Sequence, residues 1–350
     1  MLHAGLDLSR RRLDVCVLSD EGELVVEVPA PPDVEGLRYL VGKVARHRQP
    51  VRGVIESMTG ARFIHDTLEQ LGWDVLVADA QKVKGLAPLA CKTDRVDAMV
   101  LAVLSHRDLV PAIWLPDPRV RSEREQARFR LHLVKHKSIL KHRIHSTLMT
   151  FGHPCPVTDL FGLEGRKLLQ KLEIPPPWRE TLDASLYMID YLEAEIDQIE
   201  RELRATGADH QYVPLLLTVP GIGWVPAFTI AAEIGDITRF PSAKKLVGYT
   251  GLCPRVRQSG ESDRRGPLSK QGPKYLRWAM LEATMHASRH PAYSERYQRN
   301  NQRLGKQRGA RVAQVDLARK LTEAIWHMLT HDQSFDPAAA AGGAARRLAA

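Results

Sequence analysis

Two aspartates at the start of an apolar segment, Asp94 and Asp97, form the first group of side chains that could perform chemistry. They stand three residues apart, so on a helix they share one face and both carboxylates could reach one cation. Residues 98–104 are apolar and compatible with a helix, whose positive N-terminal end would favour two acids. The alternative is that Thr93 or Asp94 caps the helix and Asp97 is a solvated acid of the first turn.

Two further acids lie in segments that otherwise read as buried strands. Asp7 stands between two leucines, and Glu56 directly follows a run of aliphatic residues. Taken singly, each could be a strand-end acid that faces water. Together with the aspartate pair they give four carboxylates from three elements, a hard-oxygen set that suits Mg²⁺ or Mn²⁺. The predicted metal ligands and catalytic acids are therefore Asp7, Glu56, Asp94 and Asp97.

The elements that would position these acids are read from the hydrophobic periodicity. A three-strand meander followed by alternating helices and strands is the order of an α/β, RNase H-like fold with a mixed sheet, which we predict for residues 1–115. The pattern predicts strands within 3–18, at 24–28, 51–55 and 73–77, and helices at 34–46, at 62–71 and from the aspartate pair onward.

Composition limits the classes of protein that need be considered. The chain has 350 residues, enough for about two domains. No apolar run approaches the roughly 20 residues of a spanning helix, no secretory signal is visible, and the four cysteines form no C-x-x-C pair. A cytoplasmic protein is expected. The net charge of +9 is concentrated at residues 251–311, where fourteen Lys or Arg face four acids, so a polyphosphate partner is expected.

Residues 116–204 are predicted to be helical. A polar helix follows Pro116, and residues 119–143 carry nine Lys or Arg against two glutamates, which favours contact with a nucleic-acid backbone. Residues 178–203 carry a heptad-like apolar stripe that either packs within the domain or forms a coiled coil with a second chain. Residues 205–212 read as a linker.

The region 213–335 is predicted to be a mainly α-helical domain, followed by a disordered tail at 336–350. The Pro-Gly-Ile-Gly turn at 220–223, between apolar helices, resembles a helix-hairpin-helix whose amides could meet phosphates, although a purely structural hairpin is also possible. Ser259 lies in a glycine-bearing loop among arginines, either as an ordinary loop residue or beside a phosphodiester under attack. The predicted nucleic-acid-binding residues are Arg124, Arg128, Lys135, Gly221, Gly223, Arg255, Arg257, Arg264, Arg265, Lys270, Lys274 and Arg277.

These segments, in this order, resemble the DEDD transposases of the insertion-sequence family named one-ten. The resemblance extends over roughly residues 3 to 335. It rests on the motifs at 5–9, 56–60, 92–98, 220–223, 251–254, 259–260 and 269–272.

The resemblance implies a site-specific DNA recombinase with an N-terminal RuvC-like domain, a helical coiled-coil insertion and a C-terminal transposase domain. The four acids would hold Mg²⁺, with Mn²⁺ possible, near the scissile phosphate. Ser259 would attack that phosphate and form a transient covalent link to DNA. Donor and target DNA, a structured non-coding guide RNA called a bridge RNA, and a tetramer acting in trans in the bacterial nucleoid are further implications.

Two other functions stay open on the residues alone. The first is a metal-dependent, junction-resolving endonuclease that uses the four acids and no serine. The second is a non-enzymatic helix-hairpin-helix protein that binds DNA or RNA. Replacement of Ser259 separates the recombinase from the nuclease, and replacement of the acids separates both from the binding protein.

Overall fold

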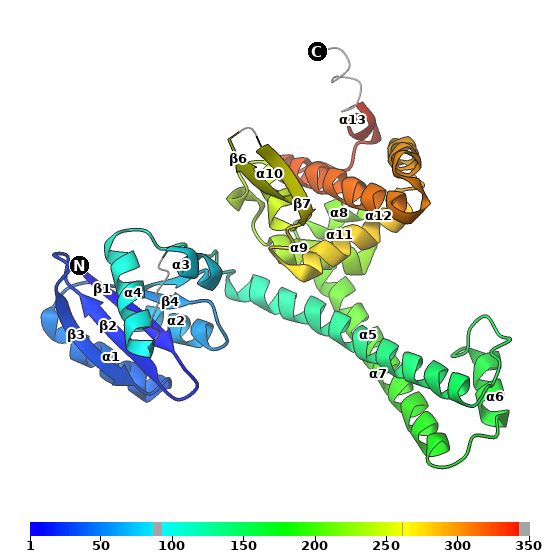
Figure 1. Cartoon of the computed structure of the whole chain (residues 1–350), viewed down its shortest axis with the longest axis horizontal. Coiled ribbons are helices and arrows are strands. Elements are labelled where there is room, and N and C mark those ends of the chain that lie inside the picture. Colours follow the sequence, from blue (N-terminus) through cyan, green and yellow to red (C-terminus); the bar gives the residue numbers. More distant parts are fainter. Residues whose placement is uncertain (87–92, 261, 343–350) are drawn as a thin grey trace. The chain divides into compact units, whose positions relative to one another are not determined.

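The chain divides into two compact units, residues 1–115 and 116–350 (Figure 1). The computed structural model describes residues 1–86, 93–260 and 262–342. Each unit has a hydrophobic core of its own. The boundary coincides with the predicted end of the first domain, whereas the second unit contains both the basic helical region and the C-terminal region that the sequence separates.

The first unit is built on a five-stranded mixed sheet with the order β3-β2-β1-β4-β5. The first three strands form an antiparallel meander, and β4 and β5 continue the sheet in parallel to β1. This order is consistent with the predicted RNase H-like arrangement. The elements are β1 (Leu2–Leu8), β2 (Leu13–Leu18), β3 (Leu24–Ala30), α1 (Val34–Val44), η1 (Ala45–His47), β4 (Val51–Glu56), α2 (Ala61–Gln70), β5 (Asp74–Ala78), α3 (Ala80–Leu86) and α4 (Asp94–His106).

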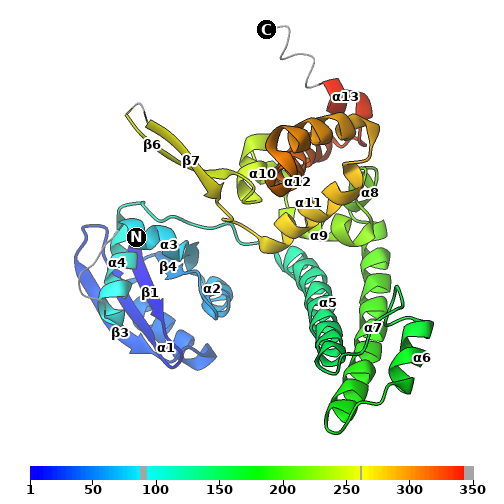
Figure 2. The same ribbon diagram turned by 45° about the vertical axis from the view of Figure 1, so that its right-hand side comes forward.

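Helices cover both faces of this sheet (Figure 2). On one face, Leu6 and the other even-numbered residues of β1 pack with apolar residues of α1 and α2. On the other face, Gly5 touches α4 so closely that a Cβ atom there would lie 1.9 Å from the carbonyl oxygen of Ala98. Only glycine permits this approach, and it holds α4 directly against the central strand.

The second unit begins with a helical hairpin made of α5 (Pro118–Thr150) and α7 (Trp178–Ala208), with α6 (Leu163–Lys171) beside it. The long helices run antiparallel, because Arg130 pairs with Glu200 at 2.6 Å and Lys137 pairs with Glu193 at 3.3 Å. Buried residues of the heptad-like stripe pack inside the unit, which is the first of its two predicted roles. Helix α7 also continues to Ala208, into the predicted linker.

In the C-terminal part of the unit, α8 and α11 pack against α9, which is almost entirely buried, and α12 packs on α10 and α11. The predicted glycine-bearing loop around Ser259 is instead a β-hairpin, because two short polar strands pair there. Helix α13 occupies part of the predicted disordered tail, and residues 343–350 lie outside the described residues. The elements are α8 (Val213–Leu217), α9 (Trp224–Ile234), η2 (Ile237–Arg239), α10 (Ala243–Tyr249), β6 (Pro254–Ser259), β7 (Ser262–Leu268), α11 (Lys274–Ala287), α12 (Pro291–His331) and α13 (Pro337–Gly342). Of the helices in the described part of the chain, none combines the length and apolarity needed to cross a membrane.

Candidate active site

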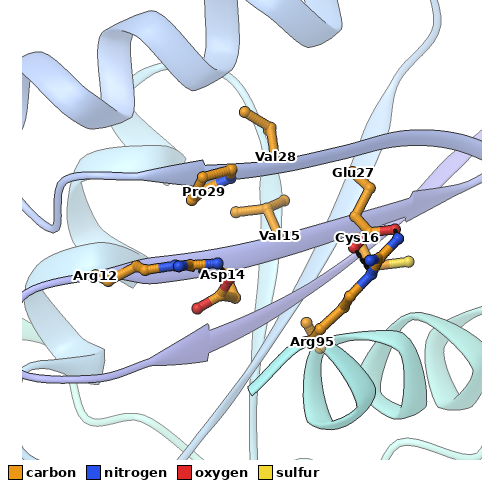
Figure 3. A pocket seen from close by; sticks show the side chains of 9 residues that line it. Arg12, Asp14, Val15, Cys16, Glu27, Val28, Pro29 and Arg95 are labelled. Atoms are coloured by element: carbon orange, nitrogen blue, oxygen red, sulfur yellow. Dashed lines mark hydrogen bonds and ion pairs between the residues drawn. The ribbon is translucent and has the colours of Figure 1, made fainter. Parts of the chain in front are cut away.

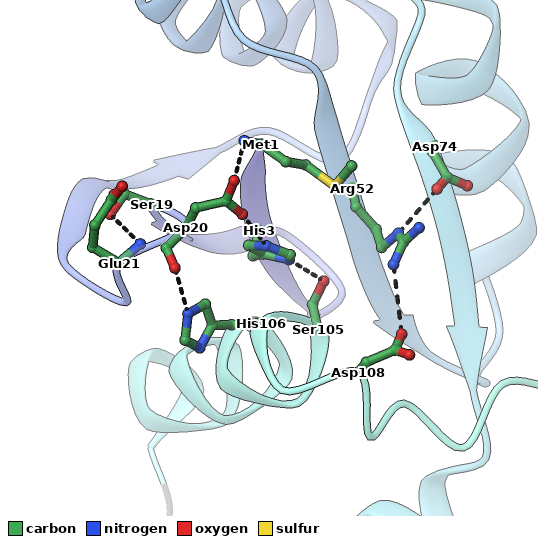
Figure 4. Close-up of polar contacts among 10 residues, drawn as sticks. All are labelled: Met1, His3, Ser19, Asp20, Glu21, Arg52, Asp74, Ser105, His106 and Asp108. Atoms are coloured by element: carbon green, nitrogen blue, oxygen red, sulfur yellow. Dashed lines mark hydrogen bonds and ion pairs between the residues drawn. The ribbon is translucent and has the colours of Figure 1, made fainter.

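The direction of α4 decides which of its residues can meet the acid on β1. Near the start of β1, Nδ1 of His3 lies 3.0 Å from Oγ of Ser105, close to the C-terminal end of α4 (Figure 4). Two residues further along the strand, Gly5 touches Ala98, nearer the middle of the helix. Helix and strand therefore run in opposite directions, and the carboxyl end of β1 meets the first turn of α4.

Asp7 is the next residue of β1 on this face, because side chains two apart in a strand point to the same side. The first turn of α4 carries Asp94 and Asp97, and the preceding Thr93 caps the helix by accepting a hydrogen bond from the Val96 amide at 3.3 Å. The capping interpretation is thus correct for Thr93. It coexists with the cluster, because the cap fixes the first turn and so aims both aspartates at the strand end.

Glu56 comes to the same place from β4. This strand runs parallel to β1 with Leu6 opposite Ile55, so Asp7 and Glu56 follow side by side at the two carboxyl ends. Val54, two residues earlier, packs with Leu101 of α4. Glu56 therefore also projects from the face that α4 covers, and all four predicted acids converge there.

The electrostatics of Asp7 report this convergence. Its pKa is raised from 3.8 to about 6, first by burial and then by the negative charges of Asp97, Asp94, Glu56 and Asp14. Each of these charges disfavours the ionised form of a partly buried carboxyl group. A divalent cation would relieve the same repulsion, so the cluster has the electrostatics of a cation site.

The donor set fits a hard cation in chemistry, since every predicted ligand is a carboxylate. Among the residues that the structure describes, however, no three His, Cys, Asp or Glu side chains are already arranged as a metal cage. Coordination would therefore require the carboxylates to turn toward a common point.

The predicted nucleophile, Ser259, is the last residue of β6 and is exposed at the tip of the hairpin. It pairs in register with Ser262, and Arg257 pairs with Arg264 two positions further down. Directly opposed residues and residues two apart share a face of a hairpin, so the two arginines lie on the face of the serines. Neither arginine has an ion-pair partner within the described ranges, which makes this face strongly positive.

Two predicted nucleic-acid contacts are wrong, because the side chains point into their own unit. Arg128 donates two hydrogen bonds to the carboxylate of Glu233, at 2.7 and 2.9 Å, and this carboxylate is fully buried in α9. Arg124 donates to the carbonyl oxygens of Ala232 and Glu233 at 2.8 and 2.7 Å. These arginines neutralise a buried charge and cap the C-terminal end of α9.

Arg277 is also used internally, since it donates to the carbonyl oxygens of Thr250 and Lys270 at 3.1 and 3.3 Å. Its prediction as a nucleic-acid contact is corrected in the same way. Gly221 has a φ of +86° and its Cβ position would lie 2.3 Å from the Ala283 carbonyl oxygen, so packing against α11 requires this glycine. Gly223, by contrast, is exposed at the start of α9.

The other predicted contacts remain on the surface. Arg265 lies on the opposite face of the hairpin from Ser259, within 3.4 Å of Asp263. Lys274 stacks over the ring of Tyr275 at 4.9 Å. The remaining exposed residues of this set are Lys135, Arg255, Arg257, Arg264 and Lys270.

Both units match families of known transposases. Residues 213–299 match the family described as Transposase IS116/IS110/IS902 family, and residues 4–152 match a second family described as Transposase. The chain is a transposase. It is thus an enzyme of DNA strand transfer, and each of its two candidate sites lies within a matched segment.

Individual relatives are similar to the chain over most of their length. The transposase for insertion sequence element IS1328 of Yersinia enterocolitica is 28% identical over 293 residues, which are 80% of this chain and 84% of the relative. A probable family 20 transposase of Pseudomonas aeruginosa is 26% identical over 297 residues, with 83% and 88% covered. A pilin gene-inverting protein of Moraxella bovis is 27% identical over 248 residues, with 70% and 68% covered.

Two residues that shape the surroundings of predicted site residues, Asp14 and Glu233, are not among the residues predicted from the sequence. Asp14 lies in a leucine- and valine-flanked strand just as Asp7 does, so the same signal could have identified it. Glu233 is an acid inside a helix that is otherwise almost entirely apolar, and such an acid predicts a buried cationic partner.

Proposed function

We propose that this transposase cuts and rejoins DNA with a metal-bound carboxylate cluster and a serine nucleophile carried on separate units. The convergence of Asp7, Glu56, Asp94 and Asp97 on one face of the sheet is the observation that supports this most strongly. With the strand order β3-β2-β1-β4-β5, it favours a RuvC-like origin for the first unit. Mg²⁺, or Mn²⁺, would be the cation.

The acids and the serine would divide the chemistry. A divalent cation supplies charge stabilisation at the scissile phosphate. Ser259 Oγ then forms a bond to phosphorus while the bond to one deoxyribose oxygen breaks, and that oxygen leaves with a proton. Attack by a different DNA end on the same phosphorus reverses the step and releases the serine. The phosphodiester energy is conserved in the covalent link, so rejoining needs no nucleotide cofactor.

The position of Ser259 supports this role. It stands exposed at the tip of a narrow two-stranded ribbon, and such a ribbon can enter a groove of DNA. The Arg257–Arg264 pair on the same face would hold the phosphate oxygens. The other exposed basic residues that would contact the DNA backbone are Lys135, Arg255, Lys270 and Lys274. The backbone amide of Gly223, at the N-terminus of α9, would donate a hydrogen bond to a phosphate.

The choice of site would come from outside the protein. We expect donor and target DNA to be selected by a structured guide RNA, and the enzyme to act as a tetramer in which the acids of one subunit meet the serine of another. The relative named for inverting a pilin gene supports site-specific recombination as the class of reaction.

Substitution of the serine tests this proposal. Ser259→Ala is expected to lose strand transfer by roughly 10⁴-fold or more, since the nucleophile is gone. Its neighbour across the turn provides the control, and Ser262→Ala should stay within about twofold of wild type, as surface substitutions usually do. Mass spectrometry should locate a trapped DNA adduct on Ser259. Cutting and rejoining at the normal rate by Ser259→Ala would instead favour a metal nuclease that uses the acids alone.

A further inference from the structure

A fifth carboxylate lies beside the four acids and has no part in the proposed chemistry. Asp14 of β2 stands directly opposite Asp7 in the antiparallel register. Directly opposed residues share a face of the sheet, so Asp14 also projects toward α4. The pair two positions earlier, on the same face, supports this, because Gly5 touches α4 and its partner Cys16 packs with Ala98 of the same helix.

Asp14 is buried, but only one of its two carboxylate oxygens accepts hydrogen bonds. The residue is 5% exposed, and its Oδ1 accepts hydrogen bonds from Nε and Nη2 of Arg12 at 2.9 and 2.5 Å (Figure 3). Its Oδ2 is buried and has no hydrogen-bond partner in the described part of the chain. A buried carboxylate oxygen without a hydrogen bond destabilises the fold, so a donor is expected to fill this position when the enzyme works.

The surroundings of Asp14 have room for such a donor. A cavity of about 60 Å³ is lined by Arg12, Asp14, Glu27 and Arg95, together with apolar atoms of neighbouring residues. This volume holds roughly two water molecules. Arg95 stands between Asp94 and Asp97 in the first turn of α4 and forms an ion pair with Glu27, so the cavity adjoins the turn that carries two of the acids.

We propose that Asp14 is a positioning residue of the acid site, which accepts a hydrogen bond from water bound to the cation held by the other four carboxylates. This inference rests on the proposed metal site. Mg²⁺ and Mn²⁺ keep part of their water shell in proteins, and a buried carboxylate oxygen beside the site can orient one of these waters. Arg12 occupies the other oxygen, which prevents Asp14 from binding the cation with both.

Substitutions of Asp14 and of Arg12 should change the cation affinity in opposite directions. Asp14→Asn keeps the shape of the side chain but removes a negative charge and a strong acceptor, so cation affinity should fall by about 10-fold, as for other outer-shell partners. Arg12→Gln removes a positive charge from the same place, so cation affinity should rise. A purely structural ion pair would instead lower stability in both variants and change the affinity in neither.

The experiment is a titration of the full-length protein with Mn²⁺, in which free Mn²⁺ is measured by electron paramagnetic resonance. Wild type, Asp7→Asn, Asp14→Asn and Arg12→Gln are compared with Glu35→Gln, which removes an exposed acid from α1 on the other face of the sheet. Thermal unfolding in EDTA is recorded for each. Weaker binding by Asp14→Asn, tighter binding by Arg12→Gln and no change in Glu35→Gln support the proposal.

Each remaining result has a definite meaning. Wild-type affinity in Asp14→Asn overturns the role of Asp14 and leaves the metal site intact. If Asp14→Asn does not fold, unchanged or weaker binding by Arg12→Gln overturns the proposal by itself. Failure of wild type to bind Mn²⁺ more tightly than Asp7→Asn overturns the metal site, and this inference with it.

Discussion

At the scale of single residues, Asp7 shows how a cluster of carboxylates lowers the stability of the fold that holds it. Burial and the neighbouring acids raise its pKa from 3.8 to about 6. Ionisation is therefore harder in the folded chain than in the unfolded chain. The contribution of this group to stability is highest at low pH, falls as the pH rises from about 4 to about 6, and stays low above that range.

Asp7→Asn is accordingly expected to stabilise the metal-free protein at pH 7.5. After allowance for solvent screening, the gain in the free energy of unfolding is on the order of 1–2 kcal/mol. The gain should disappear at about pH 3, where Asp7 is mostly protonated in both states. Chemical denaturation in EDTA at the two pH values measures it. Added Mg²⁺ should stabilise wild type and not the variant, and a destabilised Asp7→Asn at pH 7.5 would contradict the description of the cluster.

Arg128 illustrates the opposite case, a charged residue whose partner lies inside the protein. Its guanidinium neutralises the buried Glu233, and the hydrogen bonds to that carboxylate raise the pKa of Arg128 although its own burial opposes this. Removal of one member of such a pair leaves an uncompensated buried charge. The pair thus fixes α5 against α9.

Arg128→Met is expected to lower the free energy of unfolding by about 3 kcal/mol. The double variant Arg128→Met/Glu233→Met should recover most of this loss, because it removes both charges. Denaturant unfolding of the two variants measures the difference. Lys135→Met, on the exposed side of the same helix, should leave stability unchanged. If Arg128→Met weakened only DNA binding, the corrected assignment of Arg128 would itself be incorrect.

At the scale of elements, the β6–β7 hairpin separates its charges by face. Arg257 and Arg264 oppose each other on the face of Ser259, and like charges at such positions destabilise a hairpin. The other face carries Arg265, which is close to Asp263. An anion between Arg257 and Arg264 would relieve their repulsion, so the proposed phosphate contact is expected on this face of the ribbon.

Arg257→Gln and Arg264→Gln are each expected to lower strand transfer by about 10-fold or more, the loss of one charge-assisted hydrogen bond to phosphate. Arg265→Gln, on the opposite face, should retain a rate close to wild type. All three should unfold at the wild-type temperature, because the hairpin is exposed and lies outside the core. Equal losses in all three variants would show that only the total charge of the hairpin matters.

Helix α4 is the element that assembles the acid site, and a glycine makes its position possible. Close contact at Gly5 brings the helix onto β1, and antiparallel packing then places its first turn over the carboxyl end of that strand. Thr93 caps α4, so the helix begins at Asp94, the first of the two acids in this turn. The position of α4 is therefore set by packing, and its first residue is set independently by a hydrogen bond.

At the scale of the whole molecule, the acids lie in residues 1–115 and Ser259 lies in residues 116–350. Each unit has its own core, so each would carry its part of the proposed chemistry as an independently packed body. This division is compatible with the proposed active oligomer, in which the acids of one subunit meet the serine of another.

Complementation between inactive variants tests that arrangement. Asp7→Ala and Ser259→Ala, each inactive alone, should regain part of the strand-transfer activity when they are co-expressed, because mixed oligomers contain intact acids in one chain and an intact serine in another. The readout is the yield of recombined DNA. Mixtures of Asp7→Ala with Glu56→Ala, which damage the same unit, serve as the control and should stay inactive. Inactivity of both mixtures would indicate that one chain supplies both parts.

The sequence by itself determined the strands of the first unit, most of the helices and the positions of the four acids, because each of these depends on local signals. Alternating hydrophobicity sets a strand, and an acid within it, such as Asp7, conflicts with burial whatever the neighbours are. The same reasoning separated the first unit from the rest. Ser259 could be singled out only through its family resemblance, since a serine in a polar loop has no local signature.

Only the tertiary structure decided which charged residues are available to a partner. Arg128 and Lys135 look alike on one basic helix, but the first meets Glu233 more than a hundred positions away and the second faces solvent. Pairing register likewise brought Asp14 beside Asp7 and put Arg257 and Arg265 on opposite faces. The charge of a residue does not show which way its side chain points. Whether a side chain points into the fold or toward DNA depends on contacts between segments that are distant along the chain.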